Sequence, residues 1–394
     1  MPRRRAGAVA LAMMIVAGAI LGAPVHEASA SSAEHAAVAG EAGGPAARAA
    51  DLVASMTTAE QAASVIMGHI PSTDPAALSA YMAQGFGGFI LMGANMPAAS
   101  ADLPTVTGSL TVDTSLPPLI AIDQEGGIVS RLSADTYPGS TALKSQPADV
   151  TAAAFAARAS LVAQAGISVN FGTVADVTAD PSSFIFGRAL GTDPQASAER
   201  VAAATAAQEP FLASTLKHFP GHGAAPGDSH HAIPSTSESF EQWRTSDAVP
   251  FAAGVDAGAS VLMFGHLTYT AVDAAPASLS ARWHEIARDD LGFEGVIVTD
   301  DLGMLLSSGI PEYRDPVADA VAALAAGNDL VLMIAGSTPD TAGQMAAGIV
   351  AAIENGSLPP ERLADAATRV LTLRLSLSAA SADWALCSTC EPAS

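Results

Sequence analysis

The chain has 394 residues, of which 49% are hydrophobic and 14% charged, and its formal net charge is −22. Disordered chains show the reverse balance, so this composition predicts a packed globular core. A surface this acidic repels phosphate backbones, which argues against nucleic acid as a partner. Lysine occurs at only two positions, Lys144 and Lys217.

Residues 1–30 have the pattern of a secretory signal peptide. Three arginines at positions 3–5 precede an uncharged apolar run over residues 6–23, and Ala28-Ser29-Ala30 matches the small-residue cleavage pattern. An uncleaved membrane anchor is the alternative interpretation. With cleavage, we expect a secreted, extracellular protein of the cell envelope, without stable membrane insertion.

Two further segments lie outside the expected fold. Residues 31–47 are rich in Ala, Gly and Ser and are predicted to be a flexible leader, and residues 377–394 a C-terminal tail. The tail contains both cysteines, Cys387 and Cys390. A local disulfide is the simplest interpretation in a secreted protein, and we assign them no catalytic role.

Residues 48–376 alternate apolar, β-branched runs with Ala-rich helical stretches. Eight runs are predicted as strands: 64–70, 87–92, 118–123, 167–174, 214–219, 260–266, 295–300 and 329–334. Six stretches are predicted as helices: 75–84, 150–165, 196–206, 239–257, 316–326 and 343–355. This alternation predicts an α/β fold of parallel strands with helical crossovers. Eight runs favour a single-domain (β/α)8 TIM-type barrel, with an open sheet as the alternative.

Ionisable residues collect where the predicted strands end. The positions concerned are Asp123, Lys217-His218, His266 and Asp300-Asp301. In a (β/α)8 barrel the active site forms at the carboxyl ends of the strands, so these side chains predict a shared pocket. For Asp301, capping of the following turn or pairing with an arginine is the favoured interpretation.

The densest cluster of such residues lies between Lys217 and His231. In an extended segment Asp228 and His230 share one face, so the carboxylate can orient the imidazole and raise its basicity for acid–base catalysis. Histidines with an aspartate could instead bind a metal ion. For His222 and His231, a structural hydrogen bond within the loop is favoured.

Three motifs, in this order along the chain, resemble signatures of glycoside hydrolase family 3, specifically its β-N-acetylglucosaminidase branch. They are DQEGG at 123–127 with Arg131, KHFPGHG at 217–223 with Asp228-Ser229-His230, and VIVTDDLGM at 296–304. The resemblance covers about residues 50–375. It implies a retaining enzyme that removes terminal non-reducing GlcNAc from peptidoglycan fragments or chitin oligomers, with no cofactor or metal.

The resemblance also implies roles for individual residues. Asp300 would be the nucleophile that forms a covalent glycosyl-enzyme, and His230 the general acid/base oriented by Asp228. Five residues would hold the hydroxyl groups of the GlcNAc ring: Asp123, Arg131, Arg188, Lys217 and His218. The chain departs from the family pattern at Leu190, where Phe is usual, and at Ile128, where relatives often carry Arg.

Other functions remain open from the sequence. One is a family-3 β-glucosidase or aryl-glycosidase, and another is a GlcNAc phosphorylase, because a histidine acid/base leaves room for an anionic phosphate acceptor. A metal-dependent barrel hydrolase would use His218, His222, His230 and Asp300. A non-catalytic sugar-binding protein would keep the barrel without turnover.

Overall fold

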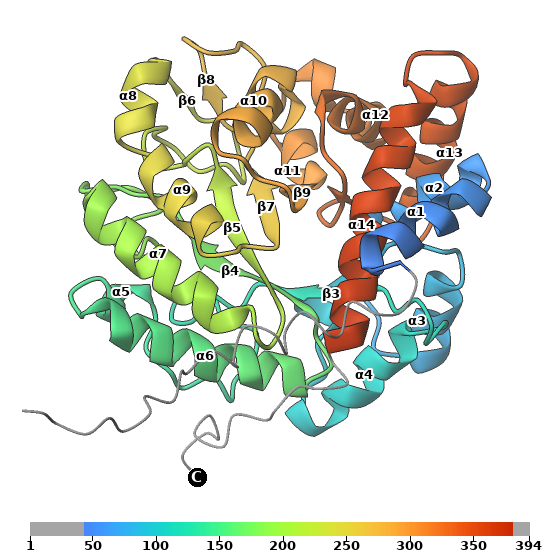
Figure 1. Ribbon diagram of the computed structural model, residues 1–394, viewed down its shortest axis with the longest axis horizontal. Helices are drawn as coiled ribbons and strands as arrows, with labels where there is room; N and C mark the ends of the chain where they lie inside the picture. Colours follow the sequence, from blue (N-terminus) through green and yellow to red (C-terminus); the bar gives the residue numbers. More distant parts are fainter. Residues whose placement is uncertain (1–42, 381–394) are drawn as a thin grey trace, which may run out of the picture. The chain divides into compact units, whose positions relative to one another are not determined.

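The computed structural model describes residues 43–380, and these form a barrel of parallel strands surrounded by helices (Figure 1). The barrel strands are β1 (Ile66–Gly68), β2 (Gly88–Leu91), β3 (Leu119–Ile122), β4 (Val169–Val174), β5 (Ala213–Phe219), β7 (Val261–Phe264), β9 (Val296–Thr299) and β10 (Val331–Leu332). Their order around the sheet is β10-β1-β2-β3-β4-β5-β7-β9. Each run that the sequence predicts as a strand overlaps one of these strands, and only β5 extends beyond its run, by one residue at Ala213.

The two edge strands of this sheet meet. Val298 and Leu330 form a parallel bridge, and the Thr299 N–H donates to the Leu330 carbonyl oxygen at 3.1 Å. The sheet is therefore a nearly closed barrel, joined between β9 and β10, which confirms the (β/α)8 TIM-type fold over the open sheet.

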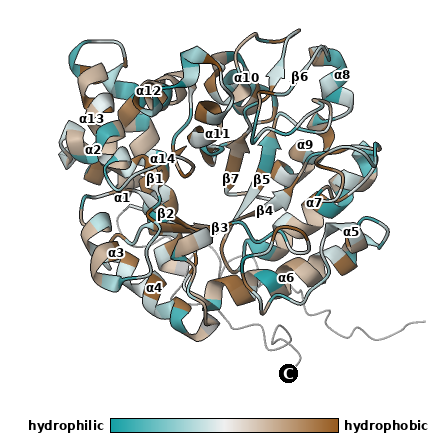
Figure 2. Ribbon diagram, turned by 180° about the vertical axis from the view of Figure 1, so that it is seen from behind, coloured by the Kyte–Doolittle hydropathy of each residue, from teal (hydrophilic) through white to brown (hydrophobic). Residues whose placement is uncertain are grey.

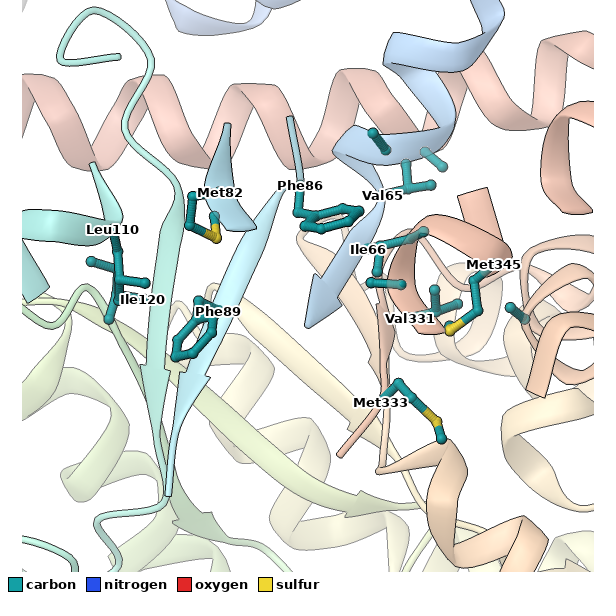
Figure 3. Close-up of a cluster of buried hydrophobic side chains, with 14 of the residues drawn as sticks. Val65, Ile66, Met82, Phe86, Phe89, Leu110, Ile120, Val331, Met333 and Met345 are labelled. Carbon is teal, nitrogen blue, oxygen red and sulfur yellow. The ribbon is translucent and has the colours of Figure 1, made fainter. Parts of the chain in front are cut away.

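Burial explains why the strands read as continuous apolar runs. Every residue of the eight barrel strands is buried, because one face packs inside the barrel and the other lies under the helices. Strands β2 and β7 are accordingly hydrophobic in Figure 2, whereas the outer helices are mixed. Figure 3 shows Phe89 of β2 with Met82 and Phe86 nearby, and Met345 near Ile66 of β1 and Val331 of β10.

Five predicted helices are confirmed, with small shifts of their ends: α3 (Pro75–Met82), α6 (Ala148–Gln164), α7 (Pro194–Gln208), α12 (Pro316–Ala326) and α13 (Thr341–Glu354). The helix predicted over 239–257 is wrong as one element. It is divided into α8 (Phe240–Thr245) and α9 (Ala248–Asp256). The Ser246 hydroxyl lies 2.9 Å from the Gln242 carbonyl oxygen, and this competition with the backbone ends α8.

Other elements were not predicted. The helices are α1 (Pro45–Ser55), α2 (Thr58–Ser64), α4 (Leu103–Leu110), α5 (Ser140–Leu143), α10 (Ala281–Glu285), α11 (Leu302–Ser307) and α14 (Pro360–Ala380). The short turns of helix are η1 (Gly93–Asn95), η2 (Ser100–Asp102), η3 (Ala277–Leu279), η4 (Ile286–Asp290) and η5 (Pro311–Tyr313). Strands β6 (Ser235–Thr236) and β8 (Thr268–Tyr269) pair in a separate small sheet.

The ends of the folded part differ slightly from the predicted ones. Helix α1 begins at Pro45, inside the predicted leader, and α14 continues to Ala380, past the predicted barrel end at 376. The predicted signal peptide, Cys387 and Cys390 lie outside the described residues. Among residues 43–380, no helix is both long and apolar enough to cross a membrane.

Candidate active site

A cavity of about 620 Å³ lies at the carboxyl ends of the barrel strands. Its size falls in the usual range for small-molecule sites. The sequence-predicted site residues that line it are Asp123, Arg131, Arg188, Lys217, His218, His230 and Asp300. Asp228 does not line the cavity but contacts His230 from behind. The structure therefore brings the predicted residues together, although they span 178 positions of sequence from Asp123 to Asp300 inclusive.

Asp300 directly follows β9 and is fixed at its end. Its backbone N–H donates to the Phe264 carbonyl oxygen of β7 at 2.8 Å, and the Asp301 N–H donates to its Oδ1 at 2.8 Å. Burial opposes ionisation, but electrostatic interactions with His218, His266 and Lys217, together with the hydrogen bond from the Asp301 N–H, outweigh it and hold the pKa of Asp300 below its ordinary value. The carboxylate is thus kept in the ionised form that a nucleophile needs.

Asp301, the next residue, has a structural role. Its carboxylate accepts hydrogen bonds from the backbone N–H groups of Gly303 at 2.9 Å, Ile334 at 2.7 Å and Ala335 at 2.9 Å. The first of these caps α11, as the sequence predicts. The other two fix the segment after β10 beside Asp300, which shapes one wall of the cavity.

His230 and Asp228 form the predicted dyad. His230 Nδ1 lies 2.6 Å from Asp228 Oδ1, which also accepts the His230 backbone N–H at 3.0 Å. Burial opposes ionisation of Asp228, but the hydrogen bonds from His230 lower the pKa of this carboxyl. Because the carboxylate engages Nδ1–H, Nε2 is the ring nitrogen left to exchange a proton in the cavity.

The charged network of the cavity is built around Glu125, for which the sequence predicts no role. Lys217 Nζ lies 2.7 Å from Glu125 Oε1 and 2.8 Å from Asp123 Oδ1. Arg188 binds Glu125 with both Nε at 3.0 Å and Nη2 at 2.7 Å. Arg131 lies farther out, 3.6 Å from Asp123.

The two carboxyls of this network stay ionised. Burial opposes their charge, but Lys217 beside both of them lowers the pKa values of Asp123 and Glu125. Burial likewise opposes the charge of Lys217, yet the same two carboxylates raise the pKa of its ammonium group. The network therefore offers fixed donors and acceptors to a ligand with many hydroxyl groups.

The glycines of the DQEGG motif explain how Glu125 reaches its place. Gly126 and Gly127 have φ values of +84° and +68°, a conformation that favours glycine. They turn the chain so that the N–H groups of Glu125 and Gly126 both donate to the Val129 carbonyl oxygen at 3.0 Å. The turn aims the Glu125 side chain back at Lys217.

Asp176 is a second residue that the sequence analysis missed. Its Oδ2 lies 2.7 Å from His218 Nδ1, and its Oδ1 accepts the backbone N–H groups of His218 at 3.2 Å and His222 at 2.6 Å. Arg188 Nη2 lies 3.2 Å from His218 Nε2. Asp176 therefore fixes the His218 ring so that Nε2 accepts from Arg188, and it also anchors the start of the loop that carries His230.

His222 and His231, the remaining histidines of the cluster, form hydrogen bonds through their backbones. The His222 N–H donates to Asp176, and the His231 N–H donates to the Asp228 carbonyl oxygen at 3.2 Å. Within residues 43–380, no group of three or more His, Cys, Asp or Glu side chains is arranged to hold a metal ion.

Comparison with known proteins places the chain in a family. Residues 62–373 match the model of the glycosyl hydrolase family 3 N terminal domain. A beta-hexosaminidase of Pseudomonas aeruginosa (strain LESB58) is 36% identical over 255 residues, which cover 63% of this chain and 74% of that protein.

Two solved structures have the same barrel. A glycoside hydrolase family 3 β-N-acetylglucosaminidase from Paenibacillus sp. str. FPU-7 superposes with a TM-score of 0.75 at 28% identity, covering 82% of this chain. The match spans 63% of the Paenibacillus chain, less than two thirds of it. A β-N-acetylhexosaminidase from Beutenbergia cavernae DSM 12333 superposes with a TM-score of 0.71 at 27% identity, covering 82% of this chain and 99% of that one. The chain belongs to glycoside hydrolase family 3.

Proposed function

We propose that the protein is a retaining exo-β-N-acetylglucosaminidase that releases terminal non-reducing GlcNAc from small soluble glycans. The observation that carries this proposal is the meeting of Asp300 and His230 in one cavity, with the first kept ionised and the second oriented by Asp228. The names of the Pseudomonas, Paenibacillus and Beutenbergia relatives support the choice of sugar.

The reaction proceeds in two steps. In the first, His230 Nε2–H gives its proton to the glycosidic oxygen while an Asp300 oxygen attacks the anomeric carbon, and the bond to the leaving sugar breaks. In the second, neutral His230 takes a proton from water, whose oxygen attacks the anomeric carbon and displaces Asp300. Two inversions give GlcNAc with its β configuration retained.

The sugar-binding network supports attack at a chain end. The side chains of Glu125 and Lys217 are 2% and 3% exposed, so their ion pair is a buried part of the cavity wall, and a site closed on this side favours a terminal sugar over a continuing glycan. Asp123, Arg131, Arg188 and His218 line the same cavity and supply hydroxyl-binding groups that are already held in place. Such fixed groups need no reorganisation as charge develops in the transition state.

The substrate and location follow from the sequence. Aromatic residues make up only 5% of the chain, which favours small soluble glycans over insoluble polymers. With the signal-peptide pattern at residues 1–30, we propose that the enzyme is exported and acts on muropeptides or chitooligosaccharides outside the cell. Mass spectrometry of the exported protein should give Ser31 as the first residue, and an intact Met1 in a membrane fraction would count against export with cleavage.

The test of the function is hydrolysis of 4-nitrophenyl β-GlcNAc beside the matching β-glucoside. We expect the wild type to prefer the GlcNAc compound and Asp300→Ala to lose this turnover. Preference for the glucoside would favour the β-glucosidase alternative, and GlcNAc-1-phosphate formed in phosphate buffer would favour the phosphorylase. A comparison of muropeptide disaccharides with chitobiose then separates the two natural substrate classes.

A further inference from the structure

The ring of Phe184 contacts both the loop that carries His230 and the side chain of Arg188. Its centroid is 5.5 Å from that of His230, with the rings nearly perpendicular at 76°, and 5.5 Å from that of His222. The Arg188 guanidinium lies 5.6 Å from the same centroid. Phe184 thus contacts the acid/base histidine, its loop and a sugar-binding arginine at once.

We infer that Phe184 is a positioning residue for proton transfer: its ring is the platform that holds the His230 imidazole over the cavity. This inference rests on the proposed function and deepens it, because it names what sets the geometry of the acid/base. Phe184 has no polar group that could take part in proton transfer. It affects the reaction only by positioning the His230 ring.

The loop that carries His230 is fixed at its start. Trp243 Nε1 donates to the Pro220 carbonyl oxygen at 2.8 Å, and the Tyr269 hydroxyl donates to the Gly221 carbonyl oxygen at 2.7 Å. Farther along, both hydrogen bonds of His230 go to Asp228, which belongs to the same loop. The loop is fixed again at its end, where the Thr268 N–H donates to the Pro234 carbonyl oxygen at 2.9 Å. The hydrogen bonds to Asp228 orient the His230 ring within the loop, and the edge-to-face contact with Phe184 joins that ring to a residue outside the loop.

The segment that presents Phe184 is itself held firmly. Ile185, the next residue, is 0% exposed. Lys144 donates to the Phe186 carbonyl oxygen, and its Nζ lies 3.9 Å from the centre of the Phe186 ring. Thr141 donates to the Gly187 carbonyl oxygen at 3.1 Å. The turn that carries Phe184 is therefore fixed. Phe184 is 37% exposed, so its ring is accessible for contact with the loop that carries His230.

The inference is tested by the dependence of the rate on the leaving group. Nitrophenolate leaves with little help from an acid, whereas the sugar alkoxide of chitobiose needs full protonation. Removing the platform should therefore lower kcat/KM for chitobiose by on the order of tenfold, a fraction of the ~10²–10⁴-fold that a positioned acid supplies. The loss for 4-nitrophenyl β-GlcNAc should be smaller.

The variant is Phe184→Ala, with Phe184→Leu in its place if the alanine variant does not fold and Phe184→Tyr as the conservative change. Tyrosine keeps the ring and should restore the wild-type ratio of the two kcat/KM values. Ile128→Ala is the matched control, because Ile128 also lines the cavity as an exposed apolar side chain but packs on Gly187. Its effect should be equal on both substrates.

The outcomes separate the two proposals. A larger loss on chitobiose in Phe184→Ala, restored by tyrosine, supports the platform. If the wild type is active and Phe184→Ala loses activity equally on both substrates, or not at all, the platform inference is wrong and the proposed function stands. A wild type that cleaves neither substrate overturns the proposed function and this inference with it.

Discussion

Glu125 and Lys217 form an ion pair deep in the cavity, with Nζ 2.7 Å from Oε1 and side chains that are 2% and 3% exposed. A buried pair of this kind costs desolvation, and its value lies in holding groups in fixed positions. Here Glu125 also holds Arg188 with two hydrogen bonds, so one carboxylate places both cations that the proposed function assigns to sugar binding. Under the proposed function, Glu125 would set the position of the sugar ring by holding the residues that contact it.

Glu125→Gln should destabilise the protein and weaken substrate binding. Removing one partner leaves buried cations without full compensation, and we expect the free energy of unfolding to fall by about 3 kcal/mol. Urea denaturation measures this change, and KM for 4-nitrophenyl β-GlcNAc should rise. Glu241→Gln is the control, since it removes an exposed ion pair with Arg244 and should cost under about 1 kcal/mol. Equal effects of the two substitutions would contradict the account.

Asp176→Asn should weaken sugar binding even though Asp176 itself does not line the cavity, because it changes the ring of His218. The amide offers Nδ1 of His218 a donor in place of an acceptor, which moves the ring proton to Nε2, where Arg188 already donates. Misplacing a binding group by about 1 Å costs on the order of 10²-fold, and we expect a loss of that size in kcat/KM. Imidazole ¹⁵N chemical shifts report the tautomer, and an unchanged His218 tautomer would argue against this role.

His230→Ala should lose activity most on poor leaving groups. A positioned acid supplies about 10²–10⁴-fold, so we expect a loss in that range on chitobiose and a smaller one on 4-nitrophenyl β-GlcNAc. Azide attacks the glycosyl-enzyme without a general base and should raise turnover of the nitrophenyl compound by the variant. A uniform loss that azide leaves unchanged would refute the acid/base assignment.

The acidic limb of kcat/KM should lie low on the pH scale. The pKa of Asp300 is held below its ordinary value, so the carboxylate stays ionised as the pH falls through the range in which an ordinary aspartate is protonated. The loss of activity from protonation of Asp300 should therefore come at a lower pH than for an ordinary aspartate. The pH profile of the wild type measures this limb, and an acidic limb near pH 6 would be inconsistent with Asp300 as the ionised nucleophile.

Much of this site could be predicted because its residues follow strands. Asp123, Lys217 and Asp300 lie at or near the ends of apolar runs, and barrel topology brings strand ends to one rim. Asp176 obeys the same rule, two residues after Val174, and could have been found by extending that run. Glu125 lies inside a motif, but its partners Lys217 and Arg188 are far away in sequence, so its role needed the tertiary structure.

The fold, like the site, could be predicted only in part from the sequence. The strands were predictable because both faces of each are buried, which makes their sequences continuously apolar. Helix α14 carried a usable signal in Pro360 at its start and in the buried spacing of Leu363, Val370 and Leu371. The break between α8 and α9 was hidden, because it involves hydrogen bonds of the Ser246 hydroxyl to Glu238, Gln242 and Asp247 that the sequence pattern does not reveal.

The central claim is that Asp300 becomes covalently attached to the sugar, and trapping that intermediate tests it most directly. The wild type is mixed with 4-nitrophenyl β-GlcNAc, quenched in acid within the first turnovers, digested and analysed by mass spectrometry. We predict one added N-acetylhexosamine on the peptide that contains Asp300, and no adduct with Asp300→Asn. An adduct on a different residue, or release of α-GlcNAc as the first product in NMR spectra with no adduct, would contradict the account.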